Sequence, residues 1–121
     1  MGVIIESCRK GLFQAVSTQV ILQESEFNIA KKLSKRTLIR FYKNIATIHL
    51  LLEPNPTEEE IKNCTKYIHP KDAHVLAAAL KSKSDYLLTL DRKHFQTEKI
   101  KLANLGIEIV TPGEFLKAIL K

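Results

Sequence analysis

Hydrophobic and polar positions along the chain alternate between short continuous apolar runs and patterns with helical spacing. The runs are typical of buried strands, and the spaced patterns predict amphipathic helices. Strands are expected at residues 12–17, 46–52, 86–90 and 107–110. Helices are expected at 2–10, 19–33, 35–45, 70–82 and 97–104, with two more that start near Thr57 and Thr111. Alternating strands and helices indicate βα units, so the expected fold is a three-layer α/β/α domain with a mainly parallel central sheet.

Residues that favour helix ends support this reading. Thr57 with Glu60, and Thr111 with Glu114, each show the T-x-x-E pattern of a capping box. Thr18 is placed to cap the helix that follows it. Clear start signals make the helices easier to predict than the strands.

Length and charge narrow the class of protein. A chain of 121 residues suits one domain, and no repeat or low-complexity tract divides it, so a single domain over 1–121 is expected. The net charge of +6, from 19 basic and 13 acidic residues, favours polyanionic partners. Basic residues are densest between Lys31 and Lys43, which form either a solvated helix face or a surface that follows phosphates.

A cytoplasmic location without a membrane partner is expected. No apolar run approaches the ~20 residues that a membrane-spanning helix needs. The first residues, MGVIIESCRKG, lack the basic start and long apolar stretch of a signal peptide. Cys8 and Cys64 have no metal-ligand spacing, so free thiols in a reducing compartment are expected.

Three acidic residues are candidates for chemistry, and each also has a simpler interpretation. Asp72 falls in a first helical turn, where the helix dipole alone favours a carboxylate. Asp91 follows an apolar strand and precedes Arg92, so it is also placed to form a turn or a cap. Glu24 lies within a helix, where a solvated charge is ordinary.

Phosphodiester hydrolysis gives a reason to consider these acids together. Divalent cations held by carboxylates can activate water and stabilise a leaving oxygen. Mg²⁺ prefers oxygen ligands, keeps several waters and needs few protein carboxylates. Ligands of open α/β sheets gather outside the carboxyl ends of the strands, where Asp91 is expected. The spacing of the three acids does not by itself bring them together.

The segment HPKDAHVLAAALKSKSDYLLTLDRKHF, residues 69–95, resembles the PIN-domain nucleases, which are metal-dependent ribonucleases that include many toxins. The ending LGIEIVTPGEFL is similar to the close of many PIN domains, and the likeness covers residues 11–121. The resemblance implies a site that binds Mg²⁺ or Mn²⁺ through several acids. It also implies RNA as substrate and, for a toxin, a cognate antitoxin as partner.

The resemblance implies particular site residues at the positions that match the acids of the family. Asp72 in KDAHVLAAAL matches the acid that opens a later helix of the family, and Asp91 in LLTLD matches the acid after the fourth strand. Glu24 matches the acid borne by an early helix, with Glu26 as the substitute. Thr89 matches a hydroxyl position of the family. We therefore expect Glu24, Asp72 and Asp91 to face one cleft, with at least one raised pKa when no metal is bound.

The sequence departs from the family at its start. PIN domains open with a strand that ends in Asp-Thr-Asn, whereas this sequence has no acid before Glu6. An upstream start, a degenerate copy or oligomerisation would each account for this. Without the opening strand, the strands near 12–17 and 85–90 are expected to pair together, splay or accept a strand from a second copy. We therefore expect a homodimer with weak metal binding and with weak or absent catalysis. RNA binding should persist.

Two functions remain open at this stage. The first is a metal-dependent endoribonuclease of PIN type, as the toxin of a toxin–antitoxin pair. The second is a catalytically inactive PIN-like module that binds RNA or a partner protein. A flavodoxin-like signalling domain fits the fold class but lacks the acidic pair and phospho-acceptor at the ends of its first strands.

The histidines are expected to matter less. His49 is expected to be packed within a strand. His69 and His74 do not have the spacing of a helical metal pair. Lys93 and His94 either contact phosphate or are ordinary surface charges of a turn.

Overall fold

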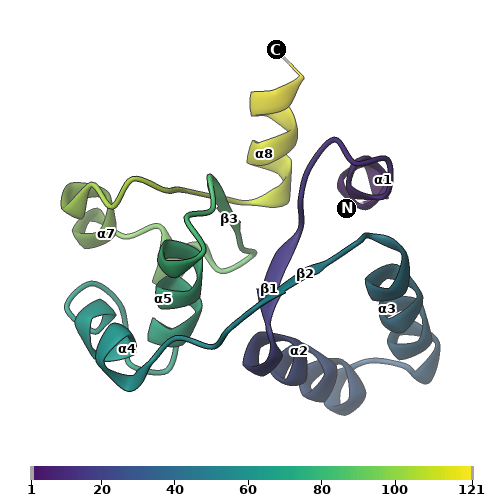
Figure 1. Ribbon diagram of the computed structural model, residues 1–121, viewed down its shortest axis with the longest axis horizontal. Helices are drawn as coiled ribbons and strands as arrows, with labels where there is room; N and C mark the ends of the chain where they lie inside the picture. The colour runs from purple at the N-terminus through teal and green to yellow at the C-terminus, as the bar shows by residue number, and fades with distance from the viewer. Residues whose placement is uncertain (1, 121) are drawn as a thin grey trace. The chain divides into compact units, whose positions relative to one another are not determined.

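The computed structural model describes residues 2–120 and divides into two compact units, Met1–Asn55 and Pro56–Lys121 (Figure 1). The first unit contains α1 (Gly2–Arg9), β1 (Val16–Thr18), α2 (Gln19–Lys32), α3 (Lys35–Thr47) and β2 (Leu51–Glu53). The second unit contains α4 (Glu58–Cys64), α5 (Ala73–Lys81), β3 (Tyr86–Leu88), α6 (Arg92–Phe95), α7 (Glu98–Ala103), β4 (Glu108–Val110) and α8 (Pro112–Ile119). The protein is therefore a mixed α/β chain in which helices predominate.

Each unit holds one two-stranded parallel sheet. β1 pairs with β2 in the register Val16 with Leu51, and β3 pairs with β4 in the register Tyr86 with Glu108. The expected parallel pairing is confirmed. Within residues 2–120, β1 and β3 do not pair with each other, and each has a hydrogen-bonded neighbour on one side only. Each sheet therefore leaves a strand edge that can accept another strand.

In the first unit, α2 and α3 contact each other and form a helical hairpin, and α2 also contacts β1. Thr18 caps α2, because its Oγ1 accepts a hydrogen bond of 3.2 Å from the Ile21 amide. Ser34 caps α3 in the same way through the Thr37 amide, at 3.2 Å. Because one residue ends α2 and the next caps α3, Leu33 and Ser34 alone make the turn of the hairpin.

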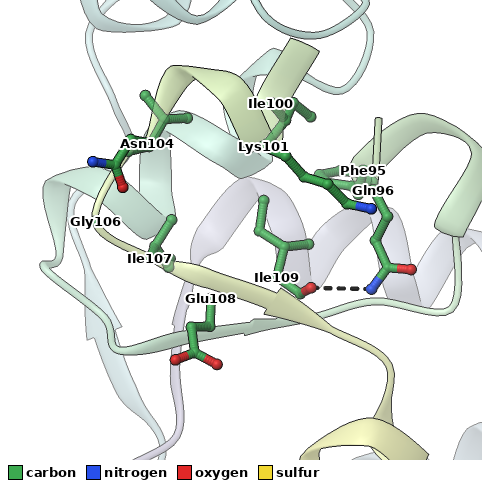
Figure 2. A pocket seen from close by; sticks show the side chains of 10 residues that line it. Phe95, Gln96, Ile100, Lys101, Asn104, Gly106, Ile107, Glu108 and Ile109 are labelled. Carbon is green, nitrogen blue, oxygen red and sulfur yellow. Dashed lines mark hydrogen bonds between the residues drawn. The ribbon is translucent and has the colours of Figure 1, made fainter. Parts of the chain in front are cut away.

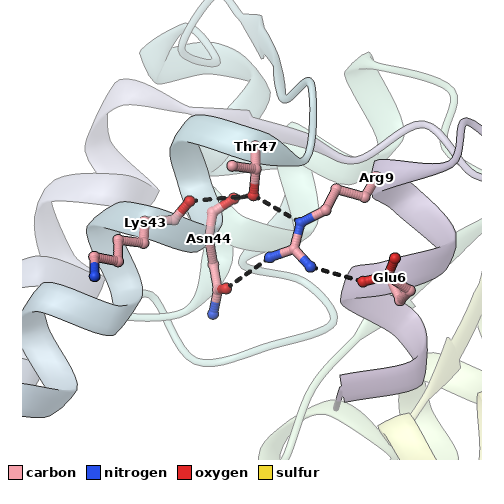
Figure 3. Close-up of polar contacts among 5 residues, drawn as sticks. All are labelled: Glu6, Arg9, Lys43, Asn44 and Thr47. Carbon is pink, nitrogen blue, oxygen red and sulfur yellow. Dashed lines mark hydrogen bonds and ion pairs between the residues drawn. The ribbon is translucent and has the colours of Figure 1, made fainter.

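Arg9 ties α1 to the last turn of α3 (Figure 3). Its Nε donates to Thr47 Oγ1 at 2.9 Å, and its Nη2 donates to Asn44 Oδ1 at 3.3 Å. Its Nη1 pairs with Glu6 Oε2 at 2.7 Å. A residue of α1 therefore holds the guanidinium in place while it donates to α3. Thr47 Oγ1 also donates to the Lys43 carbonyl, at 3.1 Å. The planar guanidinium group of an arginine can donate to several acceptors at once, so it suits this contact better than the ammonium group of a lysine would.

Both predicted capping boxes are confirmed. Thr57 accepts from the Glu60 amide at 3.1 Å while the Glu60 carboxylate accepts from the Thr57 amide at 2.8 Å. Thr111 and Glu114 repeat the exchange at 3.2 Å and 2.8 Å. In each box, the hydrogen bond from the threonine amide is the main cause that lowers the pKa of the glutamate. These contacts fix where α4 and α8 begin.

The hydrophobic core is concentrated in the second unit. Its cluster is centred on α5, where Ala73 and Leu76 are 0% exposed. Phe95 and Ile100 pack into the same cluster from α6 and α7. In the first unit the buried hydrophobic residues among those described are Ile4, Cys8 and Ile48. Both cysteines of the chain are buried free thiols, as expected.

The strands are shorter than the apolar runs that predicted them. Residues 12 and 13 form a bend and residues 14 and 15 have no regular structure, so β1 starts only at Val16. Residues 46 and 47 extend α3, so β2 starts only at Leu51. β3 stops at Leu88, although the next residue still bonds β4. Apolar character alone does not mark strand ends, because a helix or a turn can bury the same residues.

Two further differences concern single elements. His49 is exposed and has φ of 57°, so the prediction of a packed strand histidine was wrong. The left-handed residue turns the chain between α3 and β2. α6 was not predicted at all, because a helix of four residues leaves no periodic signal. Among residues 2–120, no helix has the length and apolar character needed to cross a bilayer.

Candidate metal centre

Asp91 is held at the carboxyl end of β3 by its neighbours. The Thr89 amide extends the sheet by donating to the Val110 carbonyl at 2.9 Å. The Thr89 hydroxyl accepts from the Asp91 amide at 3.0 Å and so fixes the turn that follows the strand. Asp91 then caps α6, with Oδ1 accepting from the His94 amide at 3.0 Å. Thr89 thus acts through the backbone, as a residue that positions Asp91.

His94 forms a second contact with the same carboxylate. Its Nδ1 lies 2.8 Å from Asp91 Oδ2, and both side chains are more than one third exposed. The side-chain and backbone hydrogen bonds from His94 hold the pKa of Asp91 below its usual range, with a smaller contribution from the charge of Lys93. The shift is opposite to the one that repulsion between carboxylates causes, so Asp91 is not an acid of this site with a raised pKa. Hydrogen-bond donors, not a second acid, dominate its surroundings.

The lowered pKa of Asp91 leads to a prediction. Because the folded pKa is depressed, the stabilising contribution of Asp91 is present above the ordinary carboxyl pKa and is lost as pH falls through the folded value. We expect His94→Ala to raise the pKa of Asp91 toward its ordinary value. The measurement is an NMR titration of the Asp91 carboxyl carbon in both proteins, with His69→Ala as the control. An unchanged titration in His94→Ala would show that the ring does not stabilise the carboxylate.

Asp72 reaches the same place from the start of α5. It occupies the N-cap position just before α5, and not the first helical turn as expected, and its side chain makes no capping hydrogen bond. The preceding turn is closed through the backbone, where the Asp72 amide donates to the His69 carbonyl at 2.9 Å. His69 Nδ1 also accepts from the Lys71 amide at 3.1 Å. Because its side chain accepts no capping hydrogen bond, the carboxylate of Asp72 is not committed to capping the helix.

These elements bring together three side chains, which we call the acid–histidine group. One oxygen of Asp72, one of Asp91 and one ring nitrogen of His94 all lie within 4.8 Å of one another. Asp72 and Asp91 are half-buried, whereas His94 is exposed. Two carboxylates and one imidazole at this separation are a donor set that can hold a divalent cation. Sequence reasoning missed His94 as a member, although D-x-x-H at a helix start is the spacing that creates the contact.

The third predicted acid lies in the other unit. Glu24 is exposed on α2 in the first unit, and the three members of the group all lie in the second. Glu26, the substitute, accepts a hydrogen bond from the side chain of Tyr42. The structure therefore brings together two of the three predicted acids and adds a histidine.

A separate cavity of about 370 Å³ lies between α6, α7 and β4 (Figure 2). Phe95, Ile100 and Ile109 give it an apolar wall. Gln96 crosses its rim and donates to the Ile109 carbonyl at 3.0 Å and to Glu114 Oε1 at 2.8 Å. None of the acid–histidine group lines this cavity. It is distinct from the candidate metal centre.

Comparison with protein-family models, with curated proteins and with solved structures gives no match. The resemblance to PIN domains therefore rests on the residues of this chain.

Proposed function

We propose that the chain is a metal-dependent endoribonuclease of PIN type, a hydrolase of RNA phosphodiester bonds, and the toxin of a toxin–antitoxin pair. The observation that carries the proposal is the approach of Asp72 and Asp91 within 4.8 Å. These residues lie on different elements, and both were expected as site residues before their separation was known. A three-layer PIN-like domain over 1–121 and a cytoplasmic location belong to the same proposal.

The donor set fits the implied cofactor, Mg²⁺ or Mn²⁺. Carboxylate oxygens suit both ions, and the ring nitrogen of His94 is a softer donor that Mn²⁺ accepts more readily than Mg²⁺. When bound, the ion supplies positive charge that stabilises the charge developing in phosphodiester hydrolysis. Asp72 and Asp91 would hold it, and Thr89 would keep Asp91 in place.

The basic residues of the same turn would act on the substrate. Lys93 is exposed, and its charge is close enough to Asp91 to lower the pKa of that carboxyl. The ammonium group of Lys93 can also attract a backbone phosphate of RNA. The net charge of +6 gives single-stranded RNA a general attraction to the chain, which falls as salt is added. Binding would then depend on many basic residues and cleavage on few acidic ones.

Cleavage of single-stranded RNA with added Mn²⁺ or Mg²⁺ tests the proposal. We expect slow cleavage that falls at least ~10²-fold in Asp72→Asn and in Asp91→Asn, because misplaced or missing ligands cost that much. Asp85→Asn is the matched control, since Asp85 is an exposed acid at the opposite end of the same strand. Cleavage that survives both substitutions, or that needs no divalent ion, would refute the proposal.

A second function is favoured by the strand edges. β1 and β3 each pair on one side only, which is the arrangement expected if the opening strand of the family is missing. With that strand goes its aspartate, and the chain would then be an inactive PIN-like module that binds RNA or a partner protein. A homodimer joined through these edges is part of this alternative. RNA binding without cleavage, in the assay above, is the result that selects it.

A further inference from the structure

The cavity between α6, α7 and β4 has a wall made mainly of apolar side chains. Phe95 and Ile100 line it from the two helices and are each 6% exposed. Ile107 and Ile109 line it from β4 and from the residue that leads into the strand. Figure 2 shows these two isoleucines on one side of the strand and Glu108 on the other, as strand alternation requires. The carboxylate of Glu108 therefore points away from the apolar wall.

Gln96 fixes the shape of the cavity. Its hydrogen bonds to the Ile109 carbonyl and to Glu114 join the end of α6 to β4 and to the start of α8. The loop before β4 contains Gly106, which has φ of 79°. A Cβ atom at Gly106 would meet no heavy atom within 4 Å, so this edge of the cavity is open. A site whose walls are already held in place loses little conformational freedom when a ligand binds.

Lys101 provides the positive charge of the cavity. It lies in the last turn of α7 and lines the cavity with an exposed side chain. Figure 2 shows this side chain extended toward Gln96, whereas Asn104 lies toward the Ile107 end of the cavity. Among residues 2–120, no carboxylate pairs with Lys101 and no group accepts a hydrogen bond from its ammonium. The ammonium group can therefore contact a ligand at the Gln96 end.

The charges near Lys101 limit the kind of anion that fits. The carboxylate of Glu114 accepts hydrogen bonds from the Thr111 amide and from Gln96, so it is already bound by other groups. α7 ends beside Lys101, and the partial negative charge of a helix C-terminus weakens the attraction of this residue for anions. One ammonium group with this opposing charge suits a singly charged carboxylate. Doubly charged phosphate groups bind at helix N-termini or to arginines instead.

We propose that this cavity binds a small organic acid with an apolar body. The carboxylate of the ligand contacts Lys101, and its apolar body packs against Ile109 and Ile107. The volume of about 370 Å³ is near the lower end of the range of about 300–1,000 Å³ for small-molecule sites, so the ligand is small. None of the acid–histidine group lines the cavity, so the inference holds whether or not the chain cleaves RNA.

Binding of phenylbutyrate and three analogues tests the proposal, with amide signals in NMR spectra as the readout. We expect phenylbutyrate to shift the amide signals of residues 95–109 with a dissociation constant near ~1 mM, which is usual for a ligand of its size. The neutral phenylbutyramide and the cation phenylbutylamine should bind at least ~5-fold more weakly, because the ammonium of Lys101 attracts the anion alone. Phenylbutyl phosphate, which is doubly charged, should bind no more tightly than phenylbutyrate.

Variants of α7 separate the charge from the apolar wall. Lys101→Met keeps the length of the side chain without its charge, and it should bind phenylbutyrate about 5–10-fold more weakly and phenylbutyramide equally well. Lys101→Glu should prefer phenylbutylamine to phenylbutyrate. Lys99→Met is the matched control, because Lys99 is an exposed lysine of the same helix that does not line the cavity. It should bind every probe as the unmodified chain does.

Ile107→Ala tests the apolar wall. Ile107 is half-buried and lies outside the core cluster of the second unit, so its truncation should leave the fold intact, which circular dichroism checks. The smaller side chain offers less apolar surface, so phenylbutyrate and phenylbutyramide should both bind at least ~3-fold more weakly.

Several results would overturn the proposal. Equal binding of phenylbutyrate and phenylbutyramide, or unchanged binding of the acid by Lys101→Met, would show that the charge of Lys101 plays no part. Tighter binding of phenylbutyl phosphate would assign the cavity to phosphate esters. Absence of amide shifts at ~10 mM phenylbutyrate, or shifts centred outside residues 95–109, would show that the cavity is not a site for such acids. Each of these results leaves the test of RNA cleavage unaffected.

Discussion

Asp91→Asn is expected to weaken binding of Mn²⁺ to this chain by at least ~10-fold, the lower end of what loss of a supporting residue costs a metal site. The reason is electrostatic, because the candidate centre has two carboxylates and the substitution removes the charge of one. Removing one of two charges affects a sparse site more than a site rich in acids. Isothermal titration calorimetry with Mn²⁺ measures the effect, and Asp85→Asn should bind as the unmodified chain does.

The role of His94 can be separated in the same experiment. If its ring nitrogen binds the ion, His94→Ala should weaken Mn²⁺ binding more than Mg²⁺ binding, since the nitrogen is the softer donor. If His94 only orients Asp91, through the contact of 2.8 Å, both ions should lose affinity equally. Unchanged Mn²⁺ binding in both Asp91→Asn and Asp72→Asn would show that the acid–histidine group is not a metal site.

Leu76→Ala is expected to lower the free energy of unfolding by about 2–5 kcal/mol. Leu76 is 0% exposed at the centre of α5, and its neighbours Ala73 and Ala77 are too small to fill the cavity left behind. Folded domains of this size are stable by only about 5–15 kcal/mol, so the variant should lose a large share of its stability. Denaturant unfolding followed by circular dichroism measures the change.

Leu102→Ala is the control for this substitution. It is the same chemical change at a residue that is 81% exposed, and a surface change of this kind stays within about 0.5 kcal/mol. Equal losses in the two variants would mean that the core of the second unit is not centred on Leu76.

Helix starts were predictable because they are local. Thr57 and Thr111 each find their glutamate three residues later, and such a contact needs no information from the rest of the fold. The ends of the strands were not predictable in this way, because they depend on which distant residue supplies a hydrogen-bond partner. Leu12 belongs to an apolar run and yet is 69% exposed, since no strand pairs with that residue.

The candidate site shows the same difference between what is local in the sequence and what depends on the fold. Its members Asp72 and Asp91 were found through the pattern of the surrounding segment, but their approach depends on how α5 packs beside β3. Spacing along the chain does not contain that information. His94 was undervalued because exposed histidines are common, and only the geometry shows its ring against Asp91.

The hairpin of α2 and α3 has a consequence for the lifetime of the protein in a cell. A segment with no buried side chain can open locally at little cost, and its backbone is then accessible to proteases. A partner that binds only the folded hairpin would slow this route by mass action, to an extent set by its concentration relative to its dissociation constant. Turnover of the free chain would then exceed that of the complex, so the abundance of the protein would follow that of its partner.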